Sequence, residues 1–353
     1  MLTSKKRIVY PTFCAVLFII LLLSALLSIN VGAVNIRPIW IVQIIVNKIS
    51  SSLTGQEIFT AQWPPSAVNI VWELRLPKVF AAVCVGAGLS LSGIMMQALT
   101  RNALAEPFVL GISSGASTGA VAAILMGGLP LIGTFSPKAG AFGGALLASI
   151  LIFLLSGRKN PSTTRLVLTG MVLSSFFQAF TNLMIFLSPN EKKVSSAMFW
   201  MTGSLAGVMW EDVPSVLAAA VIGILAVLPL MRGMDAMLMG EERAITQGVN
   251  TKLLKRELIV LSSFVTGIMV SISGVIGFVG LVVPHVIRAL FGSSHYRLIP
   301  ASLLLGPIFL LWADVLARVL VRPEEMPIGI LTAVFGVPFF LLLLHKSGYR
   351  FGE

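Results

Sequence analysis

Side chains that could carry chemistry are rare in this chain, and the first of them is an acidic residue inside an apolar stretch. Asp314 lies in A-D-V-L-A-R, and Arg318 follows four residues later. On a helix this spacing places both side chains on one face, where they can form an ion pair. An aspartate at membrane depth costs about 2.5–3.5 kcal/mol, so it is normally paired or faces water. The pattern favours an intramembrane ion pair. A proton relay is the alternative, but no other predicted span carries an acidic residue well inside it.

Motifs for nucleotide, metal and catalytic chemistry are missing from the sequence. There is no G-x-x-x-x-G-K-[ST] and no H-E-x-x-H, and His285, His295 and His345 are too scattered for a metal site. Cys14 and Cys84 both fall in apolar runs, which indicates small buried side chains. We therefore expect no metal, no cofactor and no enzymatic activity of the chain's own.

The composition indicates which elements must position these residues. Of the 353 residues 56% are hydrophobic and only 11% are charged, whereas a soluble domain carries about 25% charged residues. Such a chain is predicted to be an all-α, polytopic membrane protein. The net charge of +11 fits cationic loops beside anionic lipid, and no basic block with interleaved aromatic residues suggests nucleic acid.

Windows without charge place ten membrane spans. They are residues 11–34, 79–99, 107–126, 139–156, 166–187, 213–231, 253–272, 275–291, 298–320 and 327–344. A polar, tryptophan-containing segment joins the first two spans. The piece from 194 to 210 suits an interfacial or re-entrant segment better than a span, because Trp200 and Trp210 flank it.

The distribution of basic residues predicts the orientation. With both termini in the cytoplasm, sixteen of the 25 Lys and Arg residues fall in cytoplasmic segments and nine in outer ones. The first apolar run, from Ile8 to Ile36, is too long for the core of a signal peptide and is interpreted as the first span.

A break in the chain is predicted between the seventh and eighth spans. Residues 258–287 carry no charge unless His285 is protonated. This uncharged stretch is too long for one crossing of the membrane and too short for two. The chain must turn back inside this stretch, at Ser273–Gly277. Gly274, Gly277 and Gly280 let backbone or another helix approach closely. We interpret the turn as a packing or gating element at the outer side that does not itself bind substrate.

A second glycine pattern lies in the third span. Gly111, Gly115 and Gly119 recur every four residues, with Ser114 beside them, so they share one helix face. Close helix packing is the simpler interpretation, and a small-residue lining of a wide pathway is compatible with it.

Two charged regions could receive partner proteins. The loop 232–257 contains G-E-E-R-A, with Glu241 and Glu242 suited to the first turn of a short helix and Gly248 to its end. The methionines before it, at 234, 237 and 239, favour an exposed docking site over a loop packed on its own spans. Arg75, Lys78 and Arg318 lie at outer span ends, as anchors or as receptors for an acidic partner.

Several longer motifs occur in order along the chain. They are R-L-P-K at 75–78, S-G-I-M-M-Q at 92–97, R-N-A-L-A-E-P at 101–107, L-G-I-S-S-G-A at 110–116, G-E-E-R-A at 240–244, G-V-I-G-F-V-G-L-V-V-P-H-V-I-R at 274–288, A-D-V-L-A-R at 313–318 and P-E-E-M-P-I-G-I-L-T-A-V-F-G-V-P-F-F at 323–340. With these motifs the chain closely resembles one family, the permease subunits of the bacterial ATP-binding-cassette (ABC) importers for ferric siderophores, haem and cobalamin. Ala103 and Val275 stand where the family often has proline, and Lys78 replaces a common arginine.

The resemblance implies a ten-helix permease with the fold of the type II ABC importers. It implies a second permease subunit, identical or paralogous, with the translocation pathway between the two. It also implies a separate ATPase that engages Gly240, Glu241, Glu242, Arg243, Ala244 and Gly248. An extracytoplasmic binding protein would dock on Arg75, Lys78 and Arg318.

From these observations the chain is predicted to be one transmembrane permease domain, 1–353, with a cytoplasmic coupling loop at 232–257. It would move an iron–siderophore complex across the bacterial cytoplasmic membrane as part of an ABC importer. The family that the chain resembles also includes permeases for haem and cobalamin, so these are the alternative cargoes. An ion- or proton-coupled carrier is the alternative from another class.

Overall fold

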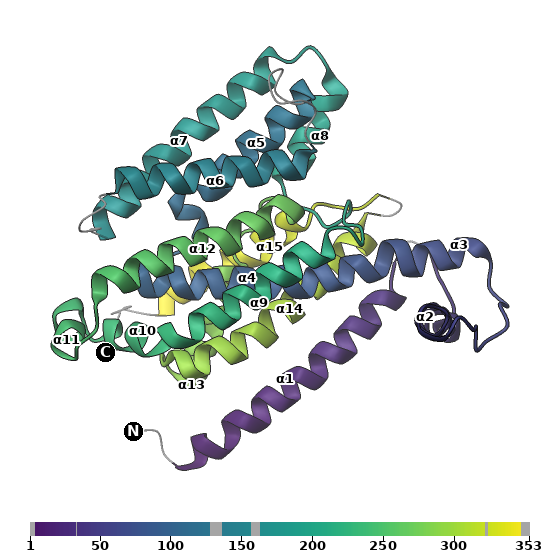
Figure 1. The fold of residues 1–353 in the computed structure, drawn as a ribbon, viewed down its shortest axis with the longest axis horizontal. Coiled ribbons are helices and arrows are strands. Elements are labelled where there is room, and N and C mark those ends of the chain that lie inside the picture. Colours follow the sequence, from purple (N-terminus) through teal and green to yellow (C-terminus); the bar gives the residue numbers. More distant parts are fainter. Residues whose placement is uncertain (1–3, 33, 128–135, 157–162, 322–323, 347–353) are drawn as a thin grey trace.

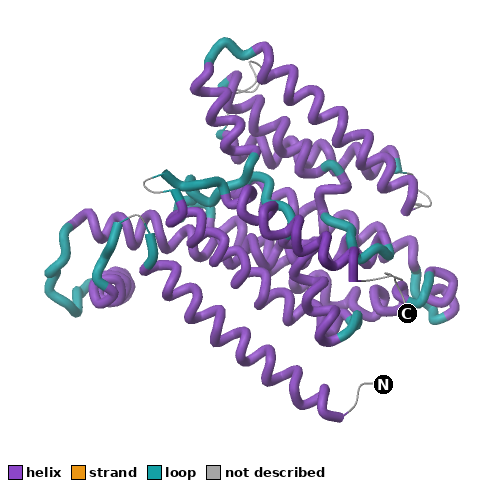
Figure 2. The backbone as a smooth tube through the Cα atoms, turned by 180° about the vertical axis from the view of Figure 1, so that it is seen from behind, coloured by secondary structure: helices purple, strands orange, loops and turns teal. Residues whose placement is uncertain are grey.

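The computed structural model describes residues 4–32, 34–127, 136–156, 163–321 and 324–346, and every regular element in these ranges is helical (Figure 2). Ten helices correspond to the ten predicted spans. They are α1 (Ser4–Asn30), α4 (Leu76–Thr100), α5 (Ile112–Met126), α6 (Pro137–Leu155), α7 (Thr163–Leu187), α9 (Val213–Val227), α12 (Thr251–Ser273), α13 (Val279–Phe291), α14 (His295–Leu320) and α15 (Ile328–Lys346).

The remaining elements are short helices that join or extend these ten. They are α2 (Pro38–Thr54), α3 (Pro65–Val68), η1 (Asn69–Arg75), η2 (Pro107–Leu110), α8 (Glu191–Met201), η3 (Leu228–Leu230), α10 (Met231–Leu238) and α11 (Glu241–Thr246).

Six helical stretches of the described chain are long and apolar enough to cross a membrane. Helix α12 has 23 residues but carries four charges in its first two turns. Helices α5, α13 and α15 offer shorter apolar stretches. The eighth predicted span needs correction, because α13 begins at Val279 and not at residue 275. Its 13 residues extend about 20 Å, less than the roughly 30 Å of a hydrocarbon core.

Helix α4 runs through the middle of the bundle, where α9, α12, α13 and α14 contact it (Figure 1). Small residues make these contacts close. A Cβ atom on Gly93 would lie 2.0 Å from the carbonyl oxygen of Gly280 in α13, and one on Gly86 would lie 2.6 Å from that of Gly306 in α14. Glycine is required at such points because the backbones themselves touch.

Helices α5, α6 and α7 form a group beside α12 (Figure 1). Gly115 and Gly119 of α5 face Gly144 and Gly140 of α6 across backbone contacts, as expected for close packing. Gly111 does not share their helix face, which corrects that prediction. It precedes α5 with a φ of 78°, because η2 ends there, and it lies against the carbonyl of Gly170 in α7.

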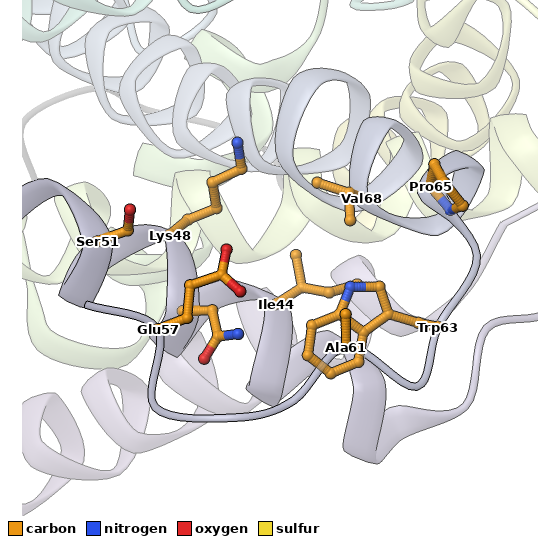
Figure 3. A pocket seen from close by; sticks show the side chains of 9 residues that line it. Ile44, Lys48, Ser51, Glu57, Ala61, Trp63, Pro65 and Val68 are labelled. Carbon is orange, nitrogen blue, oxygen red and sulfur yellow. The ribbon is translucent and has the colours of Figure 1, made fainter. Parts of the chain in front are cut away.

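The polar segment between the first two spans contains helix α2, which the sequence did not predict. Ile41 and Ile44 bury one side of it, and Gly55 ends it with a φ of 72°. The loop that follows leads into α3, η1 and α4, which are continuous. A pocket of about 280 Å³ lies between α2 and this loop, and the side chains of Ile44, Lys48, Glu57 and Trp63 gather around it (Figure 3).

The piece from 194 to 210 does not cross the bundle. Helix α8 has 11 residues, about 16 Å, and a turn follows it. In that turn the amide of Ser204 donates to the carbonyl of Ser273, the last residue of α12. The indole of Trp210 donates to the carbonyl of Trp72. The expectation of a segment that does not span is therefore in agreement with the structure.

Candidate functional site

The break after α12 lies inside the bundle. Met269 of α12 lies against Gly88 of α4, and Gly280 at the start of α13 lies against Gly93, about 10 Å from the end of α4. The start of α13 is thus at mid-depth. The expectation that the connection between α12 and α13 lies at the outer side stays a prediction, because Val275 lies against Gly329 in the first turn of α15, whereas Gly280 meets α4 about two-thirds of the way along that helix.

Phe278 gives this break its shape. It is a non-glycine residue with a φ of 67°, a conformation that bulky residues rarely adopt. Its amide donates to Oε1 of Glu106 over 2.9 Å, and its ring lies against Gly336 of α15. Glu106 thus closes the N-terminus of α13 from a loop 172 residues away. The sequence did not point to this pair.

The other two glycines of the break have different neighbours. Gly274, with a φ of 64°, ends α12 and lies against the carbonyl of Trp200 and against Gly203. Gly277 has ordinary contact distance to the ring of Phe108. The break therefore meets α4, α8, α15 and η2, and whether it moves during transport stays a prediction.

The predicted ion pair is confirmed, at the end of the bundle that was predicted to face outward. Nη2 of Arg318 lies 2.8 Å from Oδ2 of Asp314, and both side chains are buried. The same guanidinium donates to the carbonyls of Ser28 and Val31 and to the hydroxyl of Ser28. Because Asp314 is engaged in this way, nothing here favours the proton-relay alternative.

Arg75 makes similar contacts from the other side of α1. Its guanidinium donates to the carbonyls of Ile29, Asn30 and Val34. The carbonyls of Ile29 and Asn30 belong to the last turn of α1, where no amide of the helix can reach them, and that of Val34 follows the turn. A cation is favourable at this end of a helix. Two arginines therefore close the C-terminus of α1.

The three cations predicted to dock a binding protein lie together, but their side chains are not exposed to solvent. Arg75, Lys78 and Arg318 are only 5%, 6% and 4% exposed, respectively. Lys78 Nζ lies 2.7 Å from Glu325 Oε1, whose side chain is one-third exposed. A partner carboxylate can reach them only if these bonds open.

The predicted coupling loop forms α10 and α11 at the opposite end. Ala244 is buried, whereas Glu242, Arg243 and Gly248 are exposed. Nζ of Lys255 donates to Glu241 Oε1 over 2.6 Å, and this hydrogen bond lowers the pKa of the Glu241 carboxyl. Gly240 (φ 106°) and Gly248 (φ 81°) have conformations that favour glycine at the two ends of α11.

The expectation of an exposed methionine surface is wrong for two of the three residues. Met234 and Met237 are buried against the bundle, because α10 turns its apolar face inward. Met239 is exposed, and Ile245 of α11 adds a second exposed apolar side chain. The exposed surface of this end is thus smaller and more mixed than predicted.

Another contact at this end, between α10 and α14, was not predicted from the sequence. Asp235 of α10 accepts hydrogen bonds from the amide of His295 (2.8 Å) and the hydroxyl of Ser294 (3.0 Å), and it pairs with the buried imidazole of His295 at 2.5 Å. It therefore ties α10 to the first turn of α14. The sequence could have indicated only that a helix N-terminus at His295 needs an acceptor for its amides. The acceptor itself, Asp235, lies 60 positions away in the chain.

Ten stacked apolar helices, a mid-depth break and a short exposed helix joined to the bundle define a polytopic transport protein. The chain belongs to the FecCD transport family, whose family model matches residues 20–346. It is a permease of the ABC importer type, and membership implies an ATPase partner and a permease dimer.

Relatives bear this out at substantial identity. The cobalamin import system permease protein BtuC of Halobacterium salinarum is 40% identical over 288 residues, which cover 81% of this chain and 76% of the relative. The hemin transport system permease protein HmuU of Yersinia pestis is 36% identical over 345 residues, covering 95% and 96%. A solved structure described as an inward-facing conformation of a "putative metal-chelate type ABC transporter" superposes with a TM-score of 0.80 at 31% identity, covering 96% of this chain and 100% of that one.

Proposed function

We propose that this permease imports an iron–siderophore complex across the bacterial cytoplasmic membrane, with both termini in the cytoplasm. The likeness to permeases named for cobalamin and hemin, and to a metal-chelate transporter, supports a metal chelate as cargo. Haem and cobalamin are the competing cargoes within this class. The observation that carries the transport role is α11, a short exposed helix joined to a membrane bundle whose sequence has no Walker A motif of its own.

The ATPase would engage the exposed face of α11. This face consists of the exposed side chains of Glu242, Arg243 and Ile245, and the exposed Met239 extends it. Movement of α11 would reach α12 through the Lys255–Glu241 pair. Through the adjoining α10 it would reach α14 by the Asp235–His295 contact. This end of the bundle would then lie in the cytoplasm, in agreement with the basic residues of its loops.

The second permease subunit would pack along α7. On α7 the amide side chains of Gln178 and Asn182 are exposed and hydrogen-bond each other over 3.1 Å. Polar side chains facing lipid are costly, so a partner helix or a water-filled pathway fits this face better than hydrocarbon. A pathway between two such faces would offer amides to a polar chelate.

The binding protein would dock on the outer end. Of the three predicted cations, Lys78 has the most accessible partner, since Glu325 is one-third exposed. We propose that a carboxylate of the binding protein replaces Glu325 at Lys78, while Arg75 and Arg318 hold the end of α1 in place.

Uptake into proteoliposomes tests the proposal. The permease is reconstituted with its cognate ATPase and binding protein, and radiolabelled iron in hydroxamate, catecholate and citrate chelates is compared with haem and cobalamin. We expect ATP-dependent accumulation of one iron–siderophore class and none without the ATPase. Uptake driven by a proton gradient alone would support the carrier alternative, and uptake of haem or cobalamin only would correct the cargo.

A further inference from the structure

An apolar groove of about 440 Å³ lies between α6 and α12, outside the contacts discussed above. Leu146, Ile150 and Phe153 line it from α6, and Ile259, Val260 and Phe264 line it from α12. The two helices lie side by side in Figure 1 and contact each other beyond the groove. A Cβ atom on Gly267 would approach that of Ala145 to 3.3 Å, so the groove closes there.

One end of the groove is cationic. The guanidinium of Arg256 lies over the ring of Phe153, 5.2 Å from its centroid, and it remains exposed. Lys252 lies one helical turn earlier on the same face of α12 and is also exposed. Within the described part of the chain neither cation makes an ion pair, so both can receive an anion.

A buried hydroxyl adds a polar group deeper in the groove. Ser263 is 7% exposed, lines the groove and has no hydrogen-bond partner among the described residues. It lies seven residues after Arg256, about 10 Å along the helix axis. An unmade hydrogen bond of this kind is unfavourable, and an ester carbonyl in the groove could accept it.

We propose that this groove binds an anionic phospholipid. The phosphate would lie at Arg256 and Lys252, the glycerol ester region near Ser263, and an acyl chain along the apolar walls. A cation at one end of an apolar groove between membrane helices has the charge and polarity pattern of such a lipid. The proposal rests on the proposed function only in assigning this end to the cytoplasmic leaflet.

The lipid would fill the space between the α5–α7 group and α12. A bound chain would add contacts between the two sides along the groove, from Gly267 toward the charged end. Binding to the folded state alone raises the apparent stability. The melting temperature of the purified permease should therefore rise on addition of the anionic lipid.

Binding is tested on the purified full-length permease in detergent, by native mass spectrometry and thermal unfolding with phosphatidylglycerol and phosphatidylcholine. We expect tight binding of phosphatidylglycerol only. Arg256→Gln should weaken it about fivefold, as should Lys252→Gln, since each charge contributes about 1 kcal/mol. Arg165→Gln, at an exposed cation on α7 that does not line the groove, is the matched control and should change nothing.

A second variant separates the groove from the charges. Val260→Trp fills the groove from a half-exposed position and keeps both cations, so it should also abolish the shift in melting temperature. Equal binding of both lipids, unchanged binding in Arg256→Gln, or unchanged binding in Val260→Trp would overturn the proposal. A change of oligomeric state in Val260→Trp with lipid binding intact would assign the groove to a protein contact instead. Neither assay uses ATPase or cargo, so a failed transport assay would leave this result standing.

Discussion

The two ends of the bundle were both predicted to receive partner proteins, but they use charge in opposite ways. At the end predicted to face outward, Arg75, Lys78 and Arg318 are buried and bound to carbonyls and carboxylates of the chain itself. At the α11 end Glu242 and Arg243 are exposed, whereas Glu241 pairs with Lys255. A cation near the end of a span can thus be bound by carbonyls and carboxylates of its own chain. Only a charged group without such bonds is available to a partner protein.

Removing the guanidinium of Arg318 would break the outer end most severely. Arg318→Gln leaves Asp314 buried without its charge partner, which should cost about 3–5 kcal/mol of unfolding free energy. Thermal unfolding of the purified permease measures the loss. The double variant Asp314→Asn with Arg318→Gln should recover much of it, and an equally unstable double variant would contradict the ion-pair explanation.

Arg75 sharpens the comparison because the hydrogen bonds of its guanidinium within the described residues all go to backbone carbonyls. Arg75→Ala should cost about 2 kcal/mol and speed amide exchange in the last turn of α1, since its carbonyls lose a charged donor. Lys192→Ala, at an exposed cation on α8, is the control and should leave exchange in α1 unchanged. If both substitutions had the same effect, the closure of α1 by Arg75 would be unimportant.

At the α11 end a surface change should affect the partner and spare the fold. Ile245→Asp should weaken ATPase binding about tenfold, or about 1.4 kcal/mol, with an unchanged melting temperature. Co-purification and titration of the ATPase measure this. Met209→Asp, at a similarly exposed apolar residue near the outer end, should leave ATPase affinity as it was. A loss of stability in Ile245→Asp would mean that the side chain belongs to the core.

The smallest expected effect concerns Glu241. Its pKa is lowered in the folded protein by the hydrogen bond from Lys255, so its stabilisation is present above the ordinary glutamate pKa and is lost as the pH falls through the lowered value. Because the pair is partly exposed, the effect is about 0.5 kcal/mol. Protection of the α11 amides, measured relative to their intrinsic exchange rate at each pH, should fall toward low pH in the wild type. In Glu241→Gln this protection should already be lower at pH 7 and vary less with pH.

Much of the fold could be read from the sequence because charge marks the ends of membrane helices. The windows between charges located all ten helices, and the i,i+4 spacing gave the ion pair of Asp314 with Arg318. Helix α2 was missed because it lies outside the apolar windows and carries a polar, mixed face. The length of α13 was overestimated because an apolar run does not show where within it the chain becomes helical.

The candidate sites were harder to predict because burial depends on neighbours far away in the chain. The acceptors of Arg75 are backbone carbonyls more than 40 residues earlier, which no side-chain pattern reveals. Met234 and Met237 looked like a docking surface, yet α10 buries them in the bundle. The contacts of Asp235 with His295 and of Glu106 with Phe278 join segments 60 and 172 residues apart.

The mid-depth start of α13 has an electrostatic consequence. A helix that begins inside a bundle leaves its first amides without a partner in the helix, and the positive end of its dipole lies among neighbouring helices. The carboxyl group of Glu106 accepts from the amide of Phe278 at that point. A half-length helix can therefore begin between other helices because a loop from the other half of the chain brings an acceptor to it.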